Sequence, residues 1–144
     1  MKNKLRYIIL MTALCLLAVL HNKVAVHSQE DDVVPIINKQ RATISAVELK
    51  RIFTGDMTRW QNGGSVRVLL NKDGQTYEMF AKKYLGMSMN RVENLWVLKK
   101  IRDGIIPPRK VSSLVIKTMV SRSGDFIGFI KRSELDDSVK VAVE

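Results

Sequence analysis

Residues 44–60 read ISAVELKRIFTGDMTRW, and this stretch holds the clearest local structural signals in the chain. Ser45 followed by Glu48 predicts a capping box, in which the hydroxyl and the carboxylate each accept a hydrogen bond from a backbone N–H of the first helical turn. Gly55 predicts a left-handed residue that ends the helix. Trp60 follows this stop and is expected to fold back over the apolar face of the helix. That face consists of Leu49, Ile52 and Phe53 at helical spacing.

Hydrophobic periodicity and turn residues predict the other elements on either side of this helix. Strands are expected at residues 33–38, 65–70, 126–130 and 139–143. Helices are expected between residues 74 and 86, 88 and 104, and 112 and 124. Strands and helices that alternate in this way predict an α/β fold, here a single small domain with a short mixed sheet covered by helices.

Some side-chain positions within these elements are also predicted. Pro35 indicates that the first strand lies at a sheet edge or begins the pairing, because proline lacks a backbone donor. Residues 105–108, which read IIPP, predict an extended connector. The side chains expected to face inward are Val92, Leu95, Trp96 and Ile101 in the third helix and Leu114, Val115, Met119 and Val120 in the fourth.

Residues 1–28 read as a secretory signal peptide. Basic residues at positions 2, 4 and 6 precede an apolar run from Tyr7 to Leu20 that is short for a bilayer span. Small residues then suit a cut before Gln29. Residues 29–144 are left as the domain, with a periplasmic or secreted location. The competing interpretation is an uncleaved N-terminal anchor.

Removing this segment changes what the composition implies. The two histidines and the single cysteine of the chain all lie within residues 1–28, so the domain has neither residue type. Nucleophilic Ser-His-Asp and Cys-His sites and histidine or cysteine zinc sites are therefore excluded. The carboxylates show no spacing that pairs two of them, so we expect no enzyme, no cofactor and no metal. The formal net charge falls from +10 to +6 because four basic residues and no acids are removed.

The pattern I-S-x-x-E-L-x-x-I-F-x-G-x-x-x-x-W, which runs from Ile44 to Trp60, resembles a segment of the phosphate-binding proteins of ABC transporters. These are type 2 periplasmic binding proteins. The resemblance covers most of residues 33–131, and it includes Gly104 with Pro107-Pro108 and the run from Gly124 to Phe129. It implies that the α/β domain resembles one lobe of such a protein.

The same resemblance implies a ligand-binding loop. The family's R-x-D-G-S-G-T loop corresponds here to Asn71, Lys72, Asp73, Gly74, Gln75 and Thr76, one residue shorter and with asparagine in place of the arginine. Because the loop leads into a helix N-terminus, unpaired amides and the helix dipole favour an anion there, and Lys72 adds a point charge. The alternative is a plain strand-to-helix turn that Asp73 caps.

Two functions follow from these expectations. In the first, the chain is an exported, non-catalytic solute-binding protein that takes phosphate or a related small oxyanion in connection with transport or sensing. Since such proteins close two lobes around the ligand, the missing wall would come from a membrane transporter or sensor, or from a second copy in a homodimer. In the second, it is a periplasmic protein–protein interaction module without a small ligand. No nucleic acid partner is expected, because the basic residues occur as scattered pairs.

Overall fold

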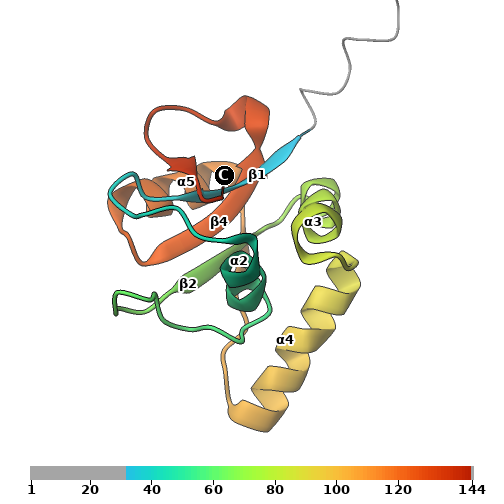
Figure 1. The fold of residues 1–144 in the computed structure, drawn as a ribbon. Coiled ribbons are helices and arrows are strands. Elements are labelled where there is room, and N and C mark those ends of the chain that lie inside the picture. Colours follow the sequence, from blue (N-terminus) through green and yellow to red (C-terminus); the bar gives the residue numbers. More distant parts are fainter. Residues whose placement is uncertain (1–31, 144) are drawn as a thin grey trace, which may run out of the picture. The chain divides into compact units, whose positions relative to one another are not determined.

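The computed structural model describes residues 32–143, and these form a five-stranded mixed sheet with helices on both faces (Figure 1). The predicted signal peptide lies outside the described residues. The strands are β1 (Val33–Ile37), β2 (Arg67–Asn71), β3 (Arg109–Val111), β4 (Phe126–Lys131) and β5 (Lys140–Val141), in the sheet order β3-β2-β4-β1-β5. Strand β2 is parallel to both β3 and β4, whereas β1 is antiparallel to β4 and β5. The predicted α/β class with a short mixed sheet is confirmed.

The helices divide between the two faces of the sheet because side chains alternate along each strand. The helices are α2 (Ala46–Phe53), α3 (Gly74–Phe80) with its π-helical continuation η1 (Ala81–Leu85), α4 (Met89–Asp103), α5 (Ser113–Arg122) and the short η2 (Arg132–Glu134). Val68 and Leu70 of β2 pack with α2, α3 and α4, whereas Leu69 packs with α5 on the other face. Within residues 32–143, no helix is both long and apolar enough to cross a membrane.

Helix α2 has the structure that its sequence predicts. Ser45 is the N-cap, and its capping box with Glu48 is complete, with N···O distances of 3.2 and 3.0 Å. Gly55 has a φ of +75°, and a Cβ there would lie 2.8 Å from the ring of Trp96. Trp60 is buried in the same hydrophobic cluster as the apolar face of α2. Local caps therefore place this helix, and long-range packing of both tryptophans holds it.

Aromatic packing fixes α3 against the sheet and against α2. The ring of Phe80 stacks on that of Phe129 in β4 with 4.0 Å between centroids, and it lies 4.6 Å from the ring of Phe53 in α2. On the opposite face, α5 approaches β4 so closely that a Cβ at Gly128 would collide with the side chain of Ile116. Helices α3 and α5, which follow β2 and β3, are thus packed closely over the two faces of β4.

The structure corrects two expectations and adds one strand. Strand β1 is internal, because β5 pairs beyond it, so Pro35 does not mark an edge. The carbonyl of Pro35 accepts a hydrogen bond from the backbone N–H of Ala142, just after the two-residue strand β5. In an antiparallel strand the N–H and C=O of one residue point to the same side, so the N–H that proline lacks would also point toward the end of β5. The connector predicted at residues 105–108 is present, and the short strand β3 that follows it was not predicted. Ile101, Leu114 and Val115 were expected to face inward but are exposed, with Ile116 buried in their place.

Candidate functional site

The segment from Asn71 to Thr76 connects β2 to α3 at the carboxyl end of the parallel strands. The chain leaves β2 toward the face covered by α3 and α4, and it leaves the neighbouring strand β3 toward the face covered by α5. Adjacent strands whose connections go to opposite faces form a topological switch point, where open α/β sheets usually bind ligands. The N-termini of α3 and α5 meet there, since Asn71 Nδ2 lies 2.9 Å from Ser113 Oγ.

Asn71 is a structural link at this edge of the sheet. Its side chain is 2% exposed, and its Nδ2 donates hydrogen bonds to Ser113 Oγ and to the carbonyl of Phe129, at 2.9 and 3.3 Å. Its Oδ1 accepts the backbone N–H of Asp73 at 3.0 Å. The carboxamide is therefore committed to protein partners and points away from solvent.

Asp73 caps α3, which confirms the local structure of the alternative interpretation. Its Oδ1 accepts the backbone N–H of Thr76 at 2.8 Å, and its backbone is extended. The hydroxyl and then the amide of Thr76 lower the pKa of the Asp73 carboxyl, and the charge of Lys131 lowers it further. Thr76 is buried, so its hydroxyl serves the cap and does not face the solvent.

The part of the loop that faces solvent consists of Lys72, Asp73, Gly74 and Gln75, so the carboxylate of Asp73 is exposed at the start of α3 although it caps this helix. The backbone N–H of Lys72 is bound to the carbonyl of Val111. No protein acceptor within residues 32–143 is found for the N–H of Gly74 or Gln75, the first two positions of α3. A Cβ at Gly74 would meet nothing within 4 Å, so the approach to these amides is open. Two unpaired backbone donors at a helix N-terminus can hold a small anion. Lys72 adds a positive charge to the same loop, and the exposed carboxylate of Asp73 opposes it.

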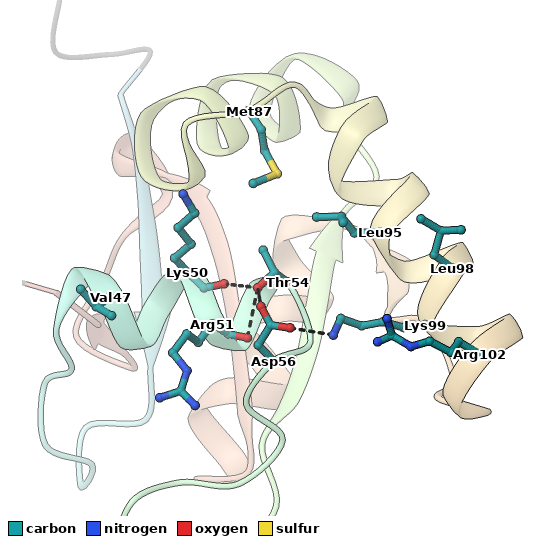
Figure 2. Close-up of a pocket in the computed structure, with 10 residues that line it drawn as sticks. All are labelled: Val47, Lys50, Arg51, Thr54, Asp56, Met87, Leu95, Leu98, Lys99 and Arg102. Atoms are coloured by element: carbon teal, nitrogen blue, oxygen red, sulfur yellow. Dashed lines mark hydrogen bonds and ion pairs between the residues drawn. The ribbon is translucent and has the colours of Figure 1, made fainter.

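Apart from this loop, a hollow of about 500 Å³ lies between α2 and α4 (Figure 2). Asp56 lines this hollow and accepts hydrogen bonds from Lys99 Nζ at 2.7 Å and from Thr54 Oγ1 at 2.8 Å. The contact with Lys99, followed by that with Thr54, lowers the pKa of Asp56. Sequence patterns do not reveal this hollow, because Asp56 and Lys99 are 43 residues apart in the chain and only the fold brings them together. No metal-binding cluster of His, Cys, Asp and Glu is found in residues 32–143.

Comparisons with known proteins support the fold. A scan of protein-family models finds no match, and neither does a search of curated proteins. One similar solved structure is an ABC-type phosphate transport receptor from Vibrio cholerae, at 20% identity and a TM-score of 0.56, covering 77% of this chain and 45% of that chain. Another, from Clostridium perfringens, is described as a phosphate ABC transporter substrate-binding protein with bound phosphate, at 23% identity and a TM-score of 0.56, covering 79% and 46%.

The chain therefore has the fold of part of a phosphate ABC transporter substrate-binding protein, and it spans under half the length of the two structures that it matches. The predicted resemblance to one lobe of such a protein is confirmed as a likeness of fold. These identities carry no conclusion about ligand or activity.

The cap of α3 gives a testable prediction. Asp73→Ala should lower the free energy of unfolding at pH 7 by about 1 kcal/mol, because it removes the acceptor for Thr76, whereas Asp73→Asn should lose less. Since folding lowers the pKa of Asp73, the advantage of the wild type over Asp73→Asn should be complete well above the usual value of 3.8 and disappear as the pH falls below it. Urea unfolding at several pH values measures both effects. An unaltered stability of Asp73→Ala at pH 7 would contradict the assignment of the cap.

Proposed function

We propose that this protein is an exported, non-catalytic binding domain that takes phosphate or a related small oxyanion at the N-terminal end of α3. The observation that carries the proposal is the pair of unpaired amides of Gly74 and Gln75, open to solvent at the switch point between β2 and β3. Two solved structures with this fold are described as phosphate receptor or substrate-binding proteins, which favours the same class of ligand.

Affinity in this site would be modest. An arginine offers an oxyanion a fixed pair of donors, whereas the carboxamide of Asn71 is turned inward and already bonded. Lys72 is exposed, so water and salt screen its charge. The missing wall would come from a transporter or sensor subunit, or from a second copy of this chain, which would exclude water and strengthen the same contacts.

Two further parts of the proposal concern location and chemistry. Residues 1–28 would be removed on export, so the exported protein should begin at Gln29, and its intact mass tests this. The domain would carry out no reaction, since residues 29–144 contain no histidine or cysteine.

The second candidate function is an interaction module without a small ligand. It is favoured by the commitment of Asn71, Asp73 and Thr76 to protein hydrogen bonds.

Thermal unfolding with phosphate separates the two functions. Residues 29–144 should be stabilised saturably by millimolar phosphate and not by chloride at equal ionic strength, because a ligand that binds the folded state alone raises stability. Gly74→Pro removes one of the two backbone N–H groups proposed to bind the anion. The variant should still fold, because proline is favoured at the first position of a helix and the extended backbone of Asp73 suits a following proline. We expect this variant to bind phosphate at least about tenfold more weakly, since a hydrogen bond to a charged group contributes about 1.5–3 kcal/mol.

Gly74→Ala is the matched control, because it keeps the N–H and its Cβ meets open space. Its phosphate-induced shift should equal that of the wild type. Lys72→Gln should reduce the shift by less than Gly74→Pro does, because an exposed charge contributes little. A wild-type protein that phosphate does not stabilise would remove the oxyanion function. A shift that survives in Gly74→Pro would place the ligand elsewhere.

A further inference from the structure

Helix α4 has an apolar stripe that no part of the described chain covers. Val92 and Trp96 form its buried face, whereas Val97, Leu98 and Ile101 are 51%, 60% and 77% exposed. Val47 of α2 is 69% exposed and lies across the hollow from Leu98 (Figure 2). Of these exposed side chains, Val47 and Leu98 line the hollow together with Met87 and Leu95. Apolar side chains gathered at a groove are typical of an interaction surface.

Basic side chains border the same hollow. Lys50 and Arg51 come from α2, and Lys99 and Arg102 come from α4. Two acids offset part of this charge: Asp56 binds Lys99 at 2.7 Å, and Asp103 binds Arg102 at 2.8 Å. The hollow therefore keeps a net positive charge, with apolar walls between two helices.

The charge selects the occupant. A second copy of this chain fits poorly, because it would bring two basic rims together and residues 29–144 already carry a net charge of +6. A small anion also fits poorly, since in Figure 2 the charged ends of Lys50, Arg51 and Arg102 point apart and not toward one centre. A flat lipid surface would leave a hollow between two helices unfilled. An extended or helical peptide can fill the hollow and reach all of these charges.

We propose that the groove between α2 and α4 docks an acidic amphipathic segment of a protein partner. The apolar side chains of this segment lie between Val47 and Leu98, and its carboxylates face Lys50, Arg51 and Arg102. The groove shares no residue with the 71–76 loop. The docking site therefore stands independently of oxyanion binding, and either function can fail without the other.

The test uses a labelled synthetic helical peptide with leucines on one face and glutamates on the other, and a counterpart with lysines in place of the glutamates. Fluorescence anisotropy with the full chain should give saturable, salt-sensitive binding of the acidic peptide. Leu98→Glu should weaken this binding at least about tenfold, because it places a like charge within the apolar contact. Leu114→Glu is the matched control: it makes the same change at a residue that is 70% exposed on α5. It should retain the wild-type affinity within about twofold.

The other results would overturn the proposal. Equal loss of affinity in Leu98→Glu and Leu114→Glu would mean nonspecific attraction to a basic protein. Equal binding of the acidic and basic peptides, or no binding of the acidic peptide, would contradict the proposal that the partner segment is acidic. Binding to phosphatidylserine vesicles that depends on Leu98, without peptide binding, would make the groove a membrane contact. Retention of peptide binding in Gly74→Pro is expected, since that change lies in the separate loop.

Discussion

The buried carboxamide of Asn71 joins the segments that build the carboxyl edge of the sheet. It donates to Ser113 at the start of α5 and to the carbonyl of Phe129 in β4, and it accepts from Asp73 at the start of α3. A buried polar group without partners costs about 1–3 kcal/mol, so losing the partners of this carboxamide would destabilise the edge. The positions of both helix N-termini, and with them the open amides of Gly74 and Gln75, depend on this link.

Much of the fold could be predicted because its signals are local. The capping box of Ser45 and Glu48, the glycine that ends α2 and the uniformly apolar β4 each depend on neighbouring residues, and the structure contains all of them. Strand β3 could not be predicted, since three residues become a strand only by pairing with β2. The exposed side of α4 was also missed, because periodicity marks apolar residues without showing which ones the rest of the chain covers.

The candidate loop was found through a family resemblance, and the structure changes the roles of its members. Asn71, Asp73 and Thr76 hold the turn together through hydrogen bonds. Asn71 and Thr76 are buried, whereas residues 72–75 face solvent. The carboxamide of Asn71 is bonded to Ser113, Phe129 and Asp73, so the first position of the loop offers no free side-chain donor. The proposed anion site consists of backbone amides and the exposed charge of Lys72. Such a site would be open to solvent, because residues 72–75 are exposed.

The central claim is that the backbone N–H groups of Gly74 and Gln75, at the start of α3, bind a small anion. The most direct test is a phosphate titration of ¹⁵N-labelled residues 29–144, in which NMR measures the backbone amide chemical shifts at each phosphate concentration. The account predicts that the largest saturable shifts occur at Gly74 and Gln75, and that residues 99–102 of α4 do not respond. Shifts that are largest elsewhere, or that do not saturate, would contradict it.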